Sequence, residues 1–364
     1  MDPKKILIIA ASLRIGGAEK VARDIALYGP PGEYEYHYVV FGDEVGAYEE
    51  ELTALGCRIF HLAPPRRSYR AYWKSLVRLM AEHRYHAVHA HNMFNCGIVM
   101  AAALLSRVPV RISHAHSALD EPGGLGTTLY EWSMRLLIRT CSTDLVACGI
   151  RAGHRLFGPA AWNRRGQLVL NGIDVSAYRS DPGARQAIRR RLGAEDAFLI
   201  GHTGHMMPVK NQRFLIGLMP RILKLRPDAR LLLLGDGPDR ETLLELVCTL
   251  GLEPFVLMPG NVTDVHLWLS AMDVFVFPSL YEGMPLSVME AQANGLPCIL
   301  SDGVPADVHL TSLIRVLPLS APQEQWAGAI CTAARPGNAD PKALAGFDVR
   351  GSMEKIHRIY KKGS

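Results

Sequence analysis

The sequence has few cysteines and no pattern that would join or ligate them. It contains seven in 364 residues, an odd number, and no CxxC pair occurs. Secreted disulfide frameworks and structural zinc sites both depend on such spacings, so the sequence favours neither. Most of the cysteines lie within apolar runs and are interpreted as buried thiols of a reducing compartment.

Long apolar runs and a strong charge of one sign are also missing. The first apolar stretch, 6–11, is too short for the core of a signal peptide. The longest later run, 98–105, is far below the roughly 20 residues that cross a bilayer. A net charge of +5 is small for this length and argues against general nucleic-acid binding. We expect a cytoplasmic protein that can lie at the inner face of the plasma membrane.

The composition is that of a globular chain with room for two domains. Hydrophobic residues make up 48% and charged residues 21%, so sizeable cores can form. Short apolar runs alternate with helical stretches, which is typical of βαβ units and of parallel sheets covered on both faces. The expected strands are 4–10, 36–41, 58–62, 86–90, 109–114, 198–203, 230–234, 255–257, 274–278 and 298–301. The helices expected among the first of these strands are 17–28, 44–55, 68–83 and 95–106.

The alternation restarts at residue 198, which predicts a second domain. The polar segment 179–183 marks a composition shift and is interpreted as the linker. In open α/β sheets, ligands bind beyond the carboxyl ends of the strands, so two facing sheets would create one cleft. We therefore predict an α/β fold with domains 1–175 and 176–347, followed by a C-terminal segment, 348–364.

The most informative segment is 277–291, which runs from an apolar strand through a Gly/Pro turn into a helix. That helix is expected to begin near Pro285, because proline suits a first helical position. Free N–H groups at a helix start form a natural diphosphate site. Glu282 precedes the helix and Glu290 lies inside it. A carboxylate accepts two hydroxyl hydrogen bonds well, so the pair could hold a sugar and a ribose; a helix-capping Glu and a solvated Glu are the alternative.

Two other loops carry groups suited to phosphate. Lys210 lies near a helix start after the strand 198–203, where its charge would add to the helix amides; an ordinary surface lysine is the alternative. Gly16 and Gly17 follow the first strand and allow a ligand to approach the backbone closely. This loop lacks the GxGxxG spacing of a dinucleotide site, so NAD binding has no support. The glycines of 235–238 are interpreted as conformational.

Two His-x-His pairs, His89 with His91 and His114 with His116, end neighbouring strands. Residues two apart in a strand share a face, so each pair can point the same way. A zinc site stays open as an alternative, although no cysteine or carboxylate is spaced with them as a ligand set. We interpret His89 as a hydrogen-bonded core histidine.

The helix 68–83 is amphipathic and basic. One arc carries Arg67, Arg70, Lys74 and Arg78, and the other carries Tyr69, Trp73, Leu76, Val77 and Met80. The basic face of 67–78 could contact anionic lipid heads or a lipid-pyrophosphate acceptor, since each basic residue near such a surface adds about 1 kcal/mol. An ordinary surface helix is the alternative.

Taken together, these motifs resemble those of the retaining glycosyltransferases of family 4, in the branch that builds bacterial capsular polysaccharides and exopolysaccharides. The resemblance rests on FPSLYEGMPLSVMEA, Lys210–Asn211, LLLLGDGPDRE, NGID and EAQANGLPCILSD, and it spans nearly the whole chain. It implies a GT-B fold of two facing Rossmann-like domains with an interdomain cleft. Residues 1–175 would form the acceptor side, 176–347 would bind the nucleotide sugar, and a helix in 348–364 would cross back to the first domain.

The resemblance also implies residue roles. Glu290 would bind the ribose hydroxyls, Glu282 the transferred sugar, and Lys210 the diphosphate. The histidine that contacts the sugar is matched by His116, with His114 as the alternative. The implied catalytic set is His116, Glu282 and Lys210. The implied donor-binding set is Gly16, Gly17, His205, Lys210, Glu282, Gly283, Leu286, Ser287 and Glu290.

One position departs from the family pattern: an arginine commonly stands five residues before the lysine, and this chain has His205 there. A neutral imidazole does not give the permanent bidentate contact of arginine. The expected activity is transfer of a sugar from a nucleotide-diphosphate donor, most commonly a UDP-sugar in the family, to a glycan or lipid-linked saccharide, with no metal or other cofactor. The alternatives are a UDP-sugar epimerase of the same fold and a non-catalytic nucleotide-sugar-binding protein.

Overall fold

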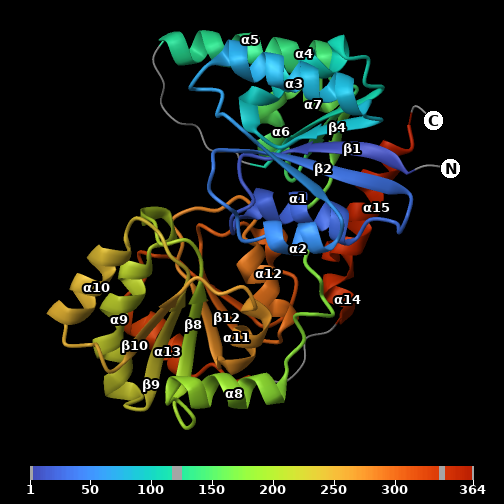
Figure 1. Ribbon diagram of the computed structural model, residues 1–364. Coiled ribbons are helices and arrows are strands. Elements are labelled where there is room, and N and C mark those ends of the chain that lie inside the picture. The colour runs from blue at the N-terminus through green and yellow to red at the C-terminus, as the bar shows by residue number, and fades with distance from the viewer. Residues whose placement is uncertain (1–2, 117–124, 336–340, 363–364) are drawn as a thin grey trace. The chain divides into compact units, whose positions relative to one another are not determined.

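The computed structural model describes residues 3–116, 125–335 and 341–362 and divides into two compact units (Figure 1). The first unit contains residues 1–172 and 349–364, and the second contains 173–348. The boundary therefore falls after Gly172, where the sequence suggested 175. Each unit is built on one parallel sheet, so the expected α/β architecture of two Rossmann-like domains is confirmed.

The sheet of the first unit has seven strands in the order β3-β2-β1-β4-β5-β6-β7, all parallel. β1, an interior strand, is apolar from Ile6 to Ile9 because both of its faces are covered there: Leu7 and Ile9 join one core and Ile6 and Ile8 the other. The strands are β1 Lys4–Ile9, β2 Tyr34–Phe41, β3 Arg58–Leu62, β4 Ala87–Ala90, β5 Val110–Ala115, β6 Asp144–Ala147 and β7 Gly166–Leu168.

Helices cover both faces of this sheet (Figure 1). The core on one face includes side chains of α3 to α7, and the core on the other includes α1, α2 and α15. The helices are α1 Gly17–Leu27, α2 Glu49–Ala54, α3 Tyr69–His83, α4 Cys96–Leu105, α5 Leu125–Cys141, α6 Ile150–Phe157, α7 Pro159–Arg165 and α15 Val349–Tyr360.

The last helix, α15, packs on the first unit although it follows the second in the chain. The hydroxyl of Ser352 donates to the carbonyl of Leu170 at 2.8 Å. His357 Nε2 lies 3.0 Å from the Tyr36 hydroxyl, and Tyr360 is fully buried among the side chains beneath the sheet. The helix therefore contributes to the core of the first unit.

The helix expected over 44–55 is wrong at its start, because α2 begins only at Glu49. A Cβ on Gly46 would lie 2.4 Å from the carbonyl carbon of Leu13, so the backbones approach closely there. The amide of Tyr48 donates to the carbonyl of Leu13 at 3.0 Å, and the amide of Gly46 donates to Glu49 Oε1 at 2.8 Å. These contacts commit the segment to a loop against the β1–α1 connection.

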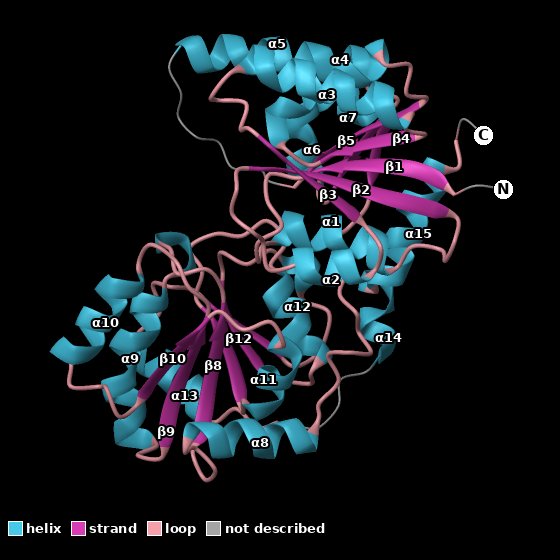
Figure 2. Cartoon of the chain, viewed as in Figure 1, coloured by secondary structure: helices cyan, strands magenta, loops and turns pink. Residues whose placement is uncertain are grey.

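The sheet of the second unit has six parallel strands in the order β10-β9-β8-β11-β12-β13. One core lies between this sheet and α9, α10 and α13, and the other lies against α8, α11, α12 and α14 (Figure 2). The strands are β8 Phe198–Thr203, β9 Ala229–Leu234, β10 Val256–Gly260, β11 Val274–Phe277, β12 Cys298–Ser301 and β13 Ile314–Leu317. The helices are α8 Pro182–Leu192, α9 Gln212–Leu225, α10 Arg240–Thr249, α11 Val265–Ala271, α12 Leu286–Ala293, α13 Gln323–Cys331 and α14 Pro341–Leu344.

Each strand order reverses once, between β1 and β4 in the first unit and between β8 and β11 in the second. Loops that leave neighbouring strands at such a point run to opposite faces of the sheet and open a crevice at its carboxyl edge. The loops after β1, β8 and β11 contain residues that the sequence predicted to bind phosphate or sugar. The topology therefore places the candidate binding loops at the carboxyl edges of the two sheets.

Candidate functional site

In the second unit, the loops after β8 and β11 are joined by an ion pair between two of the expected site residues. Lys210 Nζ lies 2.7 Å from Glu282 Oε1, and both side chains are largely buried. The same ammonium lies 5.0 Å from the centre of the Phe277 ring, a cation–π contact. A cation is therefore held at the switch point with a carboxylate as its counter-ion.

The backbone fixes both loops around this pair. The amide of Leu280 donates to the carbonyl of Val209 at 2.8 Å, and Asn211 Nδ2 donates to the carbonyl of Pro278 at 3.2 Å. Asn211 has a φ of 55°, which asparagine tolerates better than most residues. Lys210 and Glu282 are thus carried by two loops that are hydrogen-bonded to each other.

The Gly-rich turn after β9 is close-packed against the loop after β8. Gly235 has a φ of +132°, and a Cβ there would lie 2.1 Å from the carbonyl oxygen of Gly204. No other residue type fits this position, so the conformational interpretation of the 235–238 glycines agrees with the structure.

His202 in β8 was not predicted as a site residue, yet its ring packs on Phe277, the ring that Lys210 also contacts. Its Nδ1–H donates to the carbonyl of Val276 at 3.0 Å, and its ring stacks on Phe277 with centres 5.2 Å apart. Burial lowers the pKa of His202 to about 4, so the ring is neutral at pH 7. The sequence of this strand, FLIGHT, is typical of a buried strand. The feature that could have indicated His202 as a site residue is its polar side chain in an apolar run that ends at the switch point.

Three buried polar atoms at this edge have no hydrogen-bond partner among the described residues. They are His202 Nε2, Thr203 Oγ1 and Ser279 Oγ, which belong to the ends of β8 and the loop after β11. Buried polar groups are nearly always hydrogen-bonded, so these three atoms offer further hydrogen-bonding capacity at this edge. They add to the polar character that Lys210 and Glu282 give this edge.

The helix after Glu282, α12, presents uncapped amides. It starts at Leu286, with Pro285 at the N-cap, where the sequence placed that proline inside the helix. No side chain caps this end, so the first amides, including those of Leu286 and Ser287, keep donor capacity. A Cβ on Gly283 would meet nothing within 4 Å, which leaves open space beside the turn.

Glu290 lies one turn further along α12 and is 8% exposed. Its Oε1 accepts a hydrogen bond from the hydroxyl of Tyr178 at 2.8 Å. Sequence reasoning missed this partner, which lies 112 positions away in the chain. The tyrosine orients the carboxylate and leaves it acceptor capacity for ligand hydroxyls.

His205 projects from the same loop as Lys210 and is exposed. Its backbone carbonyl accepts a hydrogen bond from Gln212 Nε2 at 3.1 Å. The neighbouring Met206 is 1% exposed and packs in the core, so it anchors the loop. The imidazole itself is available to solvent or to a ligand.

In the first unit, the loop after β1 leads into the start of α1. Gly16 is the N-cap, and Gly17 begins the helix with open space where a side chain would be. Ser12 Oγ donates to Glu19 Oε1 at 3.4 Å, and burial raises the pKa of Glu19. The helix start is therefore accessible at Gly17 and carries a carboxylate in its first turn.

The four histidines of the His-x-His pairs lie together at the carboxyl ends of β4 and β5: His89 and His114 are within the strands, and His91 and His116 follow them. They form two hydrogen-bonded pairs across the strands: His89 Nε2 lies 3.1 Å from His114 Nδ1, and His91 Nδ1 lies 2.7 Å from His116 Nε2. The first pair stacks on the second, with ring centres 4.2 to 4.3 Å apart. The interpretation of His89 as a hydrogen-bonded core histidine agrees with the structure.

Burial keeps all four rings neutral at pH 7. It lowers the pKa of His89 to about 3 and that of His116 to about 4, and it places the pKa values of His91 and His114 well below the ordinary value. Ligand atoms of His89, His91 and His114 lie within 4.8 Å of one another, so these residues could hold a metal ion. However, Nε2 of His89 and Nδ1 of His114 already bond to each other, and no carboxylate belongs to the group to offset a divalent charge.

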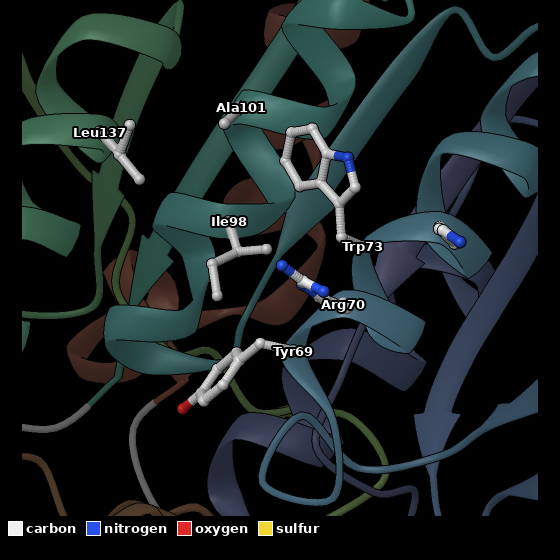
Figure 3. Close-up of a pocket in the computed structure, with 7 residues that line it drawn as sticks. Tyr69, Arg70, Trp73, Ile98, Ala101 and Leu137 are labelled. Carbon is white, nitrogen blue, oxygen red and sulfur yellow. The ribbon is translucent and has the colours of Figure 1, made fainter.

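A groove of about 540 Å³ lies on the opposite face of the first unit, between α3, α4 and α5 (Figure 3). Trp73 and Ile98 give it apolar side chains, and the basic residues Arg70 and Lys74 also line it. Tyr69, which the helical pattern placed on the apolar arc, is 47% exposed and lines the groove, whereas Tyr72, Leu76, Leu79 and Met80 form the buried side of α3.

Comparison with known proteins gives the class. A family profile described as "Glycosyl transferase 4-like domain" matches residues 16–149, and one described as "Glycosyl transferases group 1" matches 197–334. The glycosyltransferase fold with two such domains, GT-B, is therefore the fold of this chain.

Individual relatives extend the match to the whole chain. EpsF of Bacillus subtilis, which is named as a glycosyltransferase, is 32% identical over 98% of this chain and 96% of its own. The UDP-Gal:alpha-D-GlcNAc-diphosphoundecaprenol alpha-1,3-galactosyltransferase of Escherichia coli is 28% identical over 63% of this chain and 60% of its own. The structure of Anabaena Alr3699/HepE in complex with UDP-glucose superposes with a TM-score of 0.79 at 22% identity, over 97% of this chain and 98% of that one. The chain belongs to glycosyltransferase family 4.

Proposed function

We propose that this glycosyltransferase moves a sugar, with retention at the anomeric carbon, from a UDP-sugar to a lipid-linked saccharide during the synthesis of a surface polysaccharide. The observation that carries the proposal is the Lys210–Glu282 pair at the switch point of the second sheet, beside the uncapped start of α12. The named substrates of the Escherichia coli relative and the ligand of the HepE structure support UDP and a lipid-linked acceptor.

The transfer has two electrostatic requirements: a diphosphate leaves and an oxocarbenium-like sugar forms. Lys210 and the amides of Leu286 and Ser287 offer positive charge to the diphosphate without the need for a metal ion. When the diphosphate takes Lys210, Glu282 is released from its ion pair and becomes free to accept sugar hydroxyls. The proposal assigns His116 to the transferred sugar as well.

Nucleotide binding tests the donor part of the proposal. UDP at 100 times its dissociation constant should raise the free energy of unfolding by about 2.7 kcal/mol, which is several degrees in a thermal melt. GDP and ADP at the same concentration are the matched controls. A shift with UDP alone supports the assignment, and equal shifts with all three would contradict selection of the base.

Glu290→Gln should weaken UDP binding by about tenfold or more, because charged hydrogen bonds to the ribose hydroxyls contribute about 1.5 to 3 kcal/mol. Glu245→Gln, on the exposed face of α10, is the control. Titration calorimetry with UDP measures both variants. Unchanged affinity in Glu290→Gln would remove Glu290 from the donor site.

The acceptor part of the proposal rests on the outer surface of α3, α4 and α5. Within the described residues, no helix is long and apolar enough to cross a membrane. Yet α5 exposes a stripe of large apolar side chains at helical spacing, Leu129, Trp132 and Leu136, each at least 47% exposed. Arg70 and Lys74 add positive charge beside the neighbouring groove. Apolar area with basic residues around it suits the surface of an anionic bilayer, where a lipid-linked acceptor resides.

Vesicle binding tests this surface. Arg70→Gln with Lys74→Gln should reduce partitioning onto phosphatidylglycerol vesicles by tenfold or more, since each basic residue contributes about 1 kcal/mol. Trp132→Ser with Leu136→Ser should reduce vesicle partitioning by more than the Arg70 and Lys74 changes do. The binding that remains should be more sensitive to salt, because it depends on the basic residues. Leu225→Ser, an exposed leucine of the second unit, is the control. Equal partitioning of all variants in a sedimentation assay would contradict the membrane assignment.

A further inference from the structure

The four-histidine cluster continues into the C-terminal helix through Tyr360. The hydroxyl of this residue lies 2.7 Å from Nδ1 of His89, and Tyr360 is 0% exposed. The order of contacts is therefore Tyr360, His89 and His114, and then, in the stacked layer above, His91 and His116. Because β4 and β5 are parallel and His91 follows β4, the chain of contacts runs from the interior toward the carboxyl edge of the sheet.

A neutral imidazole carries one N–H and one bare nitrogen, so each hydrogen bond in such a chain fixes the next. If Tyr360 donates to His89 Nδ1, then His89 must donate from Nε2 to His114 Nδ1, and His114 is left with an N–H at Nε2. In the reverse direction, His89 donates to the tyrosine oxygen. The phenolic hydrogen would then need another acceptor at a fully buried position, where the described residues supply none.

A buried donor without a partner costs more than a bare acceptor, so the first direction is favoured. It leaves an N–H at His114 Nε2, next to His91, whose ring centre is 5.0 Å away; both His114 Nε2 and His91 Nε2 are buried and have no partner among the described residues. A single water between these two nitrogens would satisfy both atoms. His91 must then donate from Nδ1 to His116 Nε2, and the proton of His116 lies on Nδ1.

We propose that Tyr360 and the three inner histidines are positioning residues that hold His116 as the Nδ1–H tautomer, so that it presents a hydrogen-bond donor to an oxygen of the ligand. His116 Nδ1 is buried and has no partner within the described part of the chain, so it is the open end of this hydrogen-bond chain. A donor at this position suits a hydroxyl or phosphate oxygen, and it excludes His116 as a general base through that nitrogen. The consequence for turnover rests on the proposed function, whereas the tautomer does not.

The tautomers can be observed directly. Nitrogen-15 spectra of the full chain labelled at histidine distinguish a protonated from a bare ring nitrogen, and His116→Gln identifies the His116 signals by their loss. In the wild type we expect protonated Nδ1 and bare Nε2 on His116. Tyr360→Phe removes the donor that sets the direction and should convert at least a third of His116 to the other tautomer.

Tyr38→Phe is the matched control. Tyr38 is also fully buried in the first unit, and its hydroxyl donates to the carbonyl of Ala22 at 2.8 Å and not to a histidine. It should leave the His116 signals unchanged, and circular dichroism should show both variants folded. Bare Nδ1 on His116 in the wild type, or equal spectra of the two variants, would overturn the proposal.

Two further measurements separate this inference from its alternatives. Equimolar zinc chloride should leave the ring signals in place; stoichiometric loss of the His89, His91 and His114 signals would assign a metal site and overturn the hydrogen-bond chain. If UDP-sugar turnover is found, Tyr360→Phe should lower kcat at least threefold with little change in the donor KM, and Tyr38→Phe should not. The expected spectra without any turnover would support the chain of hydrogen bonds and count against the proposed function alone.

Discussion

Replacing Lys210 by methionine should weaken UDP binding at least tenfold, about 1.4 kcal/mol, and lower turnover with a UDP-sugar by as much or more. Methionine keeps an unbranched apolar stem against Phe277 and removes only the charge. Glu282, 2.7 Å from the lost ammonium, is then left without its counter-ion beside the place proposed for the diphosphate. Both the missing attraction and the added repulsion act against binding.

The partner of the pair should behave differently. In Glu282→Gln the ammonium is no longer held by a carboxylate, so UDP affinity should stay within about threefold of the wild type while turnover falls at least tenfold. Calorimetry with UDP and a UDP-release assay give the two quantities. Lys224→Met, an exposed lysine on α9, is the control. Wild-type affinity in Lys210→Met would contradict the assignment of this loop to the diphosphate.

Much of the fold could be predicted because parallel sheets covered on both faces require continuous apolar strands. The runs at 4–10, 198–203 and 274–278 correspond to β1, β8 and β11, which are the strands that flank or form the switch points. The strands β6, β7 and β13 were not predicted. They lie at or near a sheet edge, and their sequences, DLVA, GQL and IRVL, each combine a polar residue with few apolar ones, so they lack the continuous apolar run of β11.

The candidate site was predicted less completely than the fold, for a physical reason. Lys210 and Glu282 were each placed in a loop after a strand, but their 2.7 Å contact joins positions 72 residues apart. The bond from Tyr178 to Glu290 and the one from Tyr360 to His89 are longer in sequence still. Single-sequence patterns report local spacing, so they indicate which residues are unusual and not which of them meet.

The buried neutral histidines should make the protein sensitive to mild acid. In the unfolded chain a histidine takes up a proton near pH 6.5, whereas burial lowers the pKa of His89 to about 3 and those of His116 and His202 to about 4. Between pH 6.5 and about 4 the unfolded state therefore binds more protons, and the free energy of unfolding falls as the pH falls. Each ring contributes about 1.4 kcal/mol per pH unit, or about 2 kcal/mol at pH 5.

The loss should be larger in the first unit, because His91 and His114 act in the same direction there and the second unit has His202. Urea unfolding at fixed ionic strength from pH 7.5 to 5 measures it. His202→Asn should reduce the pH dependence of the free energy of unfolding of the second unit by close to one proton.

His61 is the control for the sign of the effect. Its hydrogen bond to the carbonyl of Gly42 raises its pKa, so its contribution to the free energy of unfolding is present below pH 6.5 and is lost as the pH rises. His61→Asn should therefore steepen the acid loss slightly. Unfolding free energies that stay constant from pH 7 to 5 would show that the histidine cluster accepts protons while folded, contrary to the neutral rings on which its hydrogen-bond direction depends.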